Sequence, residues 1–225
     1  MSRRYHRRTF LGLAGLGLAG AGLGAAFGPG RLQAQQGEPL CRVLQLEGQA
    51  WRDRAGQQSP LALGDDLALG DRLATGADSK VQVLFVDGSS LVLGPESECG
   101  IAVYDPEPAT AAVLLLLLVG TLRVSVGEAV EWQSYEVQGG TAVASVRGTA
   151  WAMEETPQGS AVLCLEGAVE VRSRLSGGAP PEAAGAGVVL QPGEGTDVPR
   201  NGPPSPPKTW GEARRDKLLA LVTLP

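Results

Sequence analysis

Histidine is almost missing from this chain of 225 residues. The single histidine, His6, lies near the N-terminus, ahead of an apolar stretch. Histidine supplies the base of most nucleophilic triads and is the commonest ligand of transition metals. The sequence also has no GxSxG turn and no phosphate-binding glycine loop, and its acidic residues show no pattern of a catalytic pair. It therefore predicts a protein that is not an enzyme and that carries no cofactor and no metal.

Cysteine is scarce as well. The three cysteines, Cys41, Cys99 and Cys164, show no CxxC spacing. This excludes the common zinc and thioredoxin motifs and leaves two interpretations open. One pair could form a disulfide in an oxidising compartment, or all three could be small hydrophobic residues of the core.

Only one long apolar run occurs, from Phe10 to Phe27. Two adjacent arginines precede this run, in the segment His6-Arg7-Arg8-Thr9-Phe10-Leu11. This is the pattern of a bacterial twin-arginine export signal. The run is rich in glycine and only marginally apolar, so we expect residues 1–34 to be a cleaved signal peptide rather than an anchor. The remainder would be periplasmic or otherwise exported, soluble after cleavage near Ala34. If the segment is retained, the protein would be anchored in the inner membrane with its domain outside.

The exported part is poor in positive charge. Residues 1–34 hold five of the 19 arginines and lysines and none of the 24 acidic residues, so 14 bases and 24 acids would remain, a net charge of −10. A protein with this net negative charge is not expected to attract nucleic acid or an anionic membrane surface. The partner is expected to be another envelope protein, with membrane contact only through a retained N-terminal segment.

The region from residue 41 to residue 198 has the pattern of short apolar stretches and turn residues that is typical of an all-β domain. Apolar stretches recur about every eight to twelve residues, separated by Gly, Asp-Gly, Pro and Ser. Val81, Val83 and Phe85 alternate on one face and are followed by the turn Asp87-Gly88-Ser89. The prediction is a solenoid-like or rolled stack of short strands, with a β-sandwich as the alternative.

The most apolar of these stretches is 111–119, which contains five consecutive leucines, Leu114 to Leu118. It is too short to span a bilayer. Because it is apolar on both faces, we expect a strand that is covered on both sides. If it were left exposed, such a strand would favour aggregation.

A weak internal repeat is formed by two similar segments, Leu61-Ala62-Leu63-Gly64-Asp65-Asp66 and Leu67-Ala68-Leu69-Gly70-Asp71. It indicates two tight turns between stacked strands. Asp65, Asp66 and Asp71 could supply oxygen ligands to calcium. An aspartate beside glycine is more simply a turn residue that caps backbone amides, and we favour that interpretation.

After Val198 the composition changes. Residues 199–208 are proline-rich and predict a stiff, extended linker. Thr209 and Glu212 have the spacing of a capping box, which predicts a C-terminal amphipathic helix within 209–225. Its apolar face must pack on the β domain or on a partner. That face would consist of Trp210, Ala213, Leu218, Leu221 and Val222.

Several phrases, taken in order, resemble the FecR-like periplasmic domain family over roughly residues 42–198. They are Gly48-Gln49-Ala50-Trp51, Gly70-Asp71-Arg72-Leu73-Ala74-Thr75-Gly76, Phe85-Val86-Asp87-Gly88-Ser89-Ser90, Val146-Arg147-Gly148-Thr149-Ala150-Trp151, Leu165-Glu166-Gly167-Ala168-Val169 and Leu190-Gln191-Pro192-Gly193-Glu194. The resemblance implies an all-β domain on the outer side of the inner membrane. In the best-understood members of that family, the domain senses an outer-membrane receptor and relays its state to a cytoplasmic segment that controls a sigma factor. Only nine residues precede the apolar run here, so we do not expect a cytoplasmic sigma-binding domain.

Five residues are candidate interaction residues: Arg147, Trp51, Trp132, Trp151 and Trp210. Each also has a structural interpretation, because Arg147 could pair with a carboxylate and tryptophans usually belong to the core of a small β domain. Three functions remain open. The first is an exported, non-catalytic binding module, and the second is a membrane-anchored component of FecR-type signalling. The third is a glycan or cell-wall binder, which requires Trp51, Trp132 or Trp151 to be exposed.

Overall fold

The computed structural model describes residues 37–146, 150–174 and 187–224, which belong to one compact unit. The predicted signal segment and Arg147 lie outside the described residues. The chain is mostly β-structure with one short C-terminal helix, α1 (Glu212–Leu221), which confirms the predicted fold class. Within the described part of the chain, no helix is long and apolar enough to cross a membrane. The strands are β1 (Pro39–Glu47), β2 (Ala50–Arg54), β3 (Gln57–Pro60), β4 (Asp66–Ala68), β5 (Arg72–Thr75), β6 (Lys80–Phe85), β7 (Ser90–Leu93), β8 (Glu98–Asp105), β9 (Ala112–Ser125), β10 (Ser134–Gln138), β11 (Ala142–Val146), β12 (Ala150–Thr156), β13 (Gly159–Glu166), β14 (Val169–Ser173), β15 (Val188–Leu190), β16 (Glu194–Pro199) and β17 (Lys208–Thr209).

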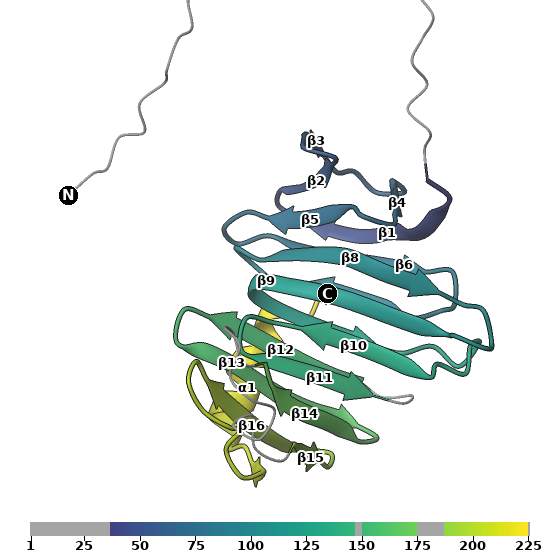
Figure 1. Ribbon diagram of the computed structural model, residues 1–225. Coiled ribbons are helices and arrows are strands. Elements are labelled where there is room, and N and C mark those ends of the chain that lie inside the picture. The colour runs from purple at the N-terminus through teal and green to yellow at the C-terminus, as the bar shows by residue number, and fades with distance from the viewer. Residues whose placement is uncertain (1–36, 147–149, 175–186, 225) are drawn as a thin grey trace, which may run out of the picture. The chain divides into compact units, whose positions relative to one another are not determined.

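The strands form one hydrogen-bonded network that is folded into two layers (Figure 1). Sheet A has the order β4-β1-β6-β7-β9-β12-β13-β16-β17. Sheet B has the order β3-β2-β5-β8-β9-β10-β11-β14-β15. The chain crosses between the layers again and again, as expected for a rolled stack of short strands. Only β9 and β10 pair in parallel among the described strands.

Strand β9 joins the two layers. Its first part, up to Val119, lies in sheet B between β8 and β10, and its second part, from Gly120, lies in sheet A between β7 and β12. Gly120 has a φ of +90°, which side chains rarely adopt. A Cβ at this position would also lie 2.6 Å from the Cα of Ser97. Glycine is therefore required where the strand changes sheets.

The main hydrophobic core fills the space between the two layers. The alternation predicted for β6 is confirmed, because Val81, Val83 and Phe85 are all buried. Through the core runs a chain of aromatic contacts with ring centroids 5.4 to 5.9 Å apart. Its members are Phe85, Tyr104, Trp132, Tyr135 and Trp151. Edge-to-face geometry between most of these rings favours a single arrangement of the core.

The turn Asp87-Gly88-Ser89 holds a buried carboxylate beside these aromatic rings. Asp87 accepts hydrogen bonds from the Ser89 hydroxyl (2.6 Å), the Ser89 amide (3.1 Å) and the Trp132 indole (3.0 Å). Burial raises the pKa of Tyr104 and Tyr135, and the negative charge of Asp87 raises both further. Asp87 thus links the β6–β7 turn to the segment that precedes β10.

The two turns of the weak internal repeat, at Asp65 and Asp71, have the same local structure. In each, the aspartate side chain accepts a hydrogen bond from the amide three residues earlier, Asp65 from Ala62 and Asp71 from Ala68, both at 2.8 Å. Asp71 is also fully buried and forms two hydrogen bonds with Arg54, each 2.6 Å long. Asp66 pairs with Arg42 at 2.8 Å. These side chains serve turns and ion pairs, and no metal-binding cluster occurs among the described residues.

All three cysteines are buried and free, which matches the interpretation as small core residues. Burial raises the pKa of each thiol, that of Cys99 to about 12. Because the thiolate is the reactive form, we expect none of them to react with a thiol reagent such as Ellman's reagent in the folded protein at pH 8. All three should react in denaturant. Rapid reaction of any thiol in the native protein would contradict the burial described here.

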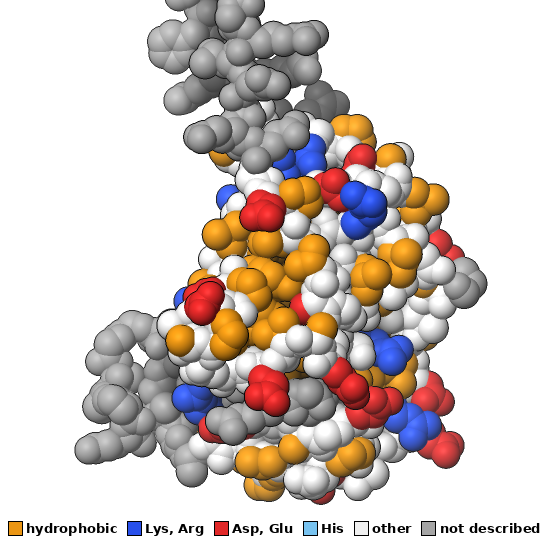
Figure 2. All heavy atoms as spheres, turned by 90° about the vertical axis from the view of Figure 1, so that its right-hand side faces the viewer, with side chains coloured by type: hydrophobic (Ala, Val, Ile, Leu, Met, Phe, Trp, Pro, Cys, Tyr) orange, Lys and Arg blue, Asp and Glu red, His pale blue; other side chains and the backbone are white. Residues whose placement is uncertain are grey.

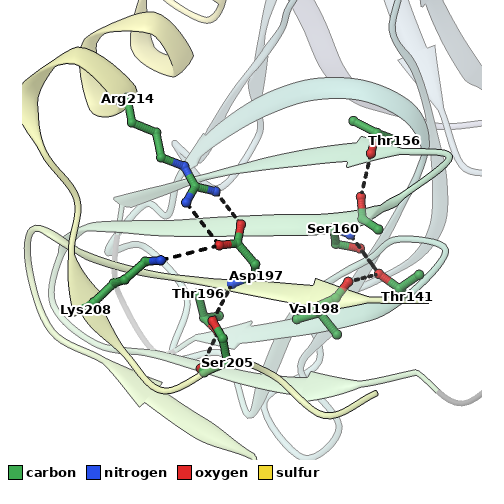
Figure 3. A network of polar contacts seen from close by, with 10 residues as sticks. Thr141, Thr156, Ser160, Thr196, Asp197, Val198, Ser205, Lys208 and Arg214 are labelled. Atoms are coloured by element: carbon green, nitrogen blue, oxygen red, sulfur yellow. Dashed lines mark hydrogen bonds and ion pairs between the residues drawn. The ribbon is translucent and has the colours of Figure 1, made fainter. Parts of the chain in front are cut away.

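The proline-rich segment 199–208 packs along the edge of sheet A. Ser205 donates its amide to the Asp197 carbonyl (2.9 Å) and accepts the Asp197 amide on its hydroxyl (3.0 Å), while Thr196 donates to the Ser205 carbonyl (2.6 Å) (Figure 3). Proline on a sheet edge prevents further strand pairing. The segment therefore covers the edge of β16.

The capping box predicted at Thr209 and Glu212 is wrong. Thr209 belongs to β17 and pairs with Glu194, and the helix begins after Gly211 without a side-chain cap. The helix packs on the chain's own sheet A, in a second hydrophobic cluster. Its contacts use Trp210, Leu218 and Val222, whereas Ala213 is exposed, so the predicted apolar face is only partly correct.

Two polar contacts hold α1 in place. Near its first turn, Arg214 stacks on Trp210 at 3.6 Å and forms an ion pair with Asp197, which Lys208 also approaches at 3.9 Å (Figure 3). At its end, the Lys80 ammonium donates to the carbonyls of Ala220 (2.8 Å) and Thr223 (2.7 Å). A cation at this position satisfies free carbonyls and complements the helix dipole.

The ion pair at Asp197 makes stability depend on pH. Hydrogen bonds from Arg214 lower the pKa of Asp197. This stabilisation is therefore present above the unfolded-state pKa of about 4 and is lost as pH falls through the lower folded-state value. Because both partners are partly exposed, we expect Asp197→Asn to cost only about 0.5–1 kcal/mol at pH 7 in urea unfolding. The difference should shrink as the pH falls below about 4. Asp216→Asn, which removes only a contact with neighbouring Arg215, is the matched control.

Candidate interaction surface

The outer face of sheet B is not covered by any described element. It faces the viewer in Figure 1, with α1 behind the opposite layer. Strand register aligns two rows of outward side chains across this face. One row is Asp53, Arg72, Gly100, Leu116, Gln138, Val143 and Arg172. The other is Val103, Leu114, Glu136, Ser145, Glu170 and Val189. We call this surface the open face.

The leucine run lies at the centre of the open face, and the prediction that it is covered on both sides is wrong. Leu115 and Leu117 point inward and are buried, as expected for one face of a strand. Leu114 and Leu116 point outward and are half-buried, and Leu118 is 48% exposed. Neighbouring strands shield the outward leucines only at their sides. An apolar centre on an exposed sheet is a typical feature of a docking surface.

Charged residues flank the apolar centre. On the β5–β8 side, Arg72 contacts Glu98 at 3.1 Å. On the other side, Arg172 contacts both Glu136 (3.4 Å) and Glu170 (3.7 Å). These three residues line a shallow groove of about 390 Å³ between β10, β11, β14 and β15. The open face thus combines an apolar strip with a polar groove beside it.

The outer face of sheet A differs because the protein covers it itself. Helix α1 and Trp210 pack over Val92, Ala152, Ala161 and Leu163, which form the second hydrophobic cluster. The two sheets therefore have unequal outer faces. Among the described residues, the central apolar residues of sheet B are not covered by a further element, whereas sheet A keeps exposed apolar side chains such as Leu44 and Leu84 on β1 and β6, away from α1.

The structure separates the five predicted interaction residues. Trp132, Trp151 and Trp210 are buried, and Arg147 lies outside the described residues. Trp51 is half-buried on β2, and register aligns it with Ala74, Glu98 and Val119 on the open face. Burial of Trp132 and Trp151 leaves Trp51 as the one of the three tryptophans that could stack on a glycan. Sequence reasoning missed the outward leucines, because five identical residues in a row give no alternation that would mark an outer face.

The acidic character expected from the composition is visible at the surface. Figure 2 shows one side of the molecule, on which acidic side chains are spread around a hydrophobic area. The described residues include no histidine, and no group of side chains that could hold a metal ion occurs among them.

Comparison with known proteins supports the family resemblance. Residues 71–170 match the family model described as FecR protein. The match includes β5 to β13 and most of the open face. The resemblance inferred from the sequence is therefore confirmed over this range. No curated protein sequence matches the chain.

Two crystal structures of a candidate anti-sigma factor from Parabacteroides distasonis have a similar fold. Both are 20% identical to this chain and cover 66% of it, with TM-scores of 0.51 and 0.50. The matched regions span 64% and 63% of those chains, less than two thirds of their length. At this identity the similarity shows a common fold.

Proposed function

We propose that this protein is an exported, non-catalytic component of a FecR-type sigma-factor regulatory system, and that it docks a protein partner through the open face. The observation that carries the proposal is the row of outward leucines on β9, in which Leu114 and Leu116 are half-buried and Leu118 is exposed. Exposed leucines on a strand favour aggregation unless a partner covers them. A protein that retains them has a use for the surface.

The FecR match and the likeness to a candidate anti-sigma factor support a regulatory role. They favour it over a free-standing envelope module, which we placed first on the sequence alone. Export is supported by the Arg7-Arg8 pattern before the apolar run. Fractionation of cells that express the full chain, followed by intact mass measurement, tests this part. A soluble species that begins near Gln35 indicates cleavage, and a full-length species in the inner membrane indicates an anchor.

Transcription in the source bacterium tests the regulatory role. We expect deletion of the gene to alter the transcripts of one sigma-factor regulon. A chromosomal Leu116→Ser variant should alter the same transcripts if the open face is the docking surface. The exposed helix variant Ala213→Ser is the control and should behave as wild type. A deletion strain with no sigma-dependent change would contradict the proposal.

A further inference from the structure

We propose that the partner segment bound by the open face is a positively charged stretch of protein that also carries apolar side chains. This inference rests on the proposed docking function and names the chemistry of the occupant. It is drawn from the balance of charges on the face and from the way that these charges are paired.

Among the described residues of the open face, acids outnumber bases. The two rows hold three carboxylates, those of Asp53, Glu136 and Glu170, and Glu98 adds a fourth beside Arg72. They hold only two guanidinium groups, those of Arg72 and Arg172. Arg72 is matched by Glu98, so the excess negative charge lies at the two ends of the face, at Asp53 on β2 and in the groove, where two glutamates share Arg172.

The groove has unused capacity for a cation. Glu136 and Glu170 share the single guanidinium of Arg172, at 3.4 and 3.7 Å. Their side chains are 28% and 53% exposed, so they remain within reach of a second cation. Glu136 also accepts a hydrogen bond from the Ser145 hydroxyl at 2.9 Å. Each carboxylate has about four acceptor positions, and these two donors do not occupy them all. A lysine or arginine of a partner would find two carboxylates beside the leucine strip.

The charge excess also argues against other occupants. A second copy of this chain would bring the same excess of acids against the first, and like charges across an interface oppose binding. Nucleic acid and anionic lipid would be repelled in the same way. A segment with basic side chains alone would not make apolar contacts with the leucines at the centre of the face. The face therefore fits a segment in which leucine-like and basic side chains lie close together.

A defined peptide tests this inference on the full-length chain. The probe is an acetylated and amidated peptide of alternating leucine and lysine, and the matched peptides replace lysine by glutamate or leucine by serine. Binding is measured by calorimetry in 50 mM salt, and amide shifts map the contact. We expect only the leucine–lysine peptide to bind, with shifts concentrated on the sheet B strands β8, β9, β10, β11 and β14.

Charge variants locate the cation. Glu136→Gln with Glu170→Gln should weaken binding of the leucine–lysine peptide about fivefold. The matched double variant Glu212→Gln with Asp216→Asn, on exposed positions of α1, removes the same charge elsewhere and should change it less than twofold. Equal binding by both double variants, or equal binding of the leucine–glutamate peptide, would overturn the inference. Dimer formation through the face in sedimentation would overturn it as well.

A further variant separates the two proposals. Leu116→Ser keeps the charges of the face and should abolish peptide binding and alter the sigma-dependent transcripts. If Leu116→Ser alters the transcripts while the Glu136/Glu170 double variant has no effect on peptide or transcripts, the docking function stands and the basic partner is wrong. If neither variant affects the transcripts, the docking function is wrong.

Discussion

Replacement of Trp151 by alanine should destabilise the protein by about 3–5 kcal/mol, because it empties the largest fully buried side-chain position. Trp151 lies on β12 and ends the aromatic chain at Tyr135, with ring centroids 5.9 Å apart. The substitution removes the buried apolar surface of the Trp151 side chain. It also leaves a cavity between the two layers, which the surrounding strands cannot fill because they are held by their hydrogen bonds. Urea unfolding followed by circular dichroism measures the effect.

The matched control for this variant is Trp51→Ala. Trp51 is half-buried at the open face, where its ring borders Gly76, and we expect a loss of only about 1–2 kcal/mol. Trp151→Phe keeps a ring in contact with Tyr135 and should retain much of the lost stability. If Trp151→Ala cost no more than Trp51→Ala, the aromatic chain would not be the centre of the core.

Gly120→Ala is expected to have the second largest effect, a loss of about 3 kcal/mol. One part is backbone strain, because an alanine at a φ of +90° is disfavoured. The other part is steric, because the new Cβ would lie 2.6 Å from the Cα of Ser97. Ser97 accepts the amide of Thr121 at 2.8 Å, so movement of either strand would disturb the point where β9 changes sheets.

Gly56→Ala separates the two parts. Gly56 has a φ of +83°, but no atom lies within 4 Å of the position of a new Cβ. This variant should show only the backbone part, about 1 kcal/mol. Equal losses at Gly56 and Gly120 in urea unfolding would mean that the crossing of β9 is not tightly packed.

The regular features of the fold could be predicted from local pattern. Alternation identified the buried face of β6, and the Gly-Asp pairs identified the turns at Asp65 and Asp71, because each of these features depends on neighbouring residues alone. Coverage of the leucine run depends instead on what packs against the second face of a sheet. Sequence spacing carries no such information, and the expectation of cover for Leu114 and Leu116 was therefore wrong.

The C-terminal segment shows a second reason for disagreement. Thr209 has the spacing of a helix cap relative to Glu212, but pairing with Glu194 places it in β17. Distant strand pairing thus overrode a local signal. The tryptophans were predicted as either core or contact residues, and only the register of β2, β5 and β8 distinguished Trp51 from the buried three.

Site-specific photo-crosslinking in the source bacterium tests most directly whether the open face is a docking surface. A photoreactive phenylalanine analogue would replace Leu116 in one strain and Ala213, on the exposed side of α1, in another. We predict a discrete crosslinked protein from the Leu116 position and none from Ala213. Its contact segment should contain leucine-like and basic residues. No crosslink at Leu116, or the same products from both positions, would contradict the account.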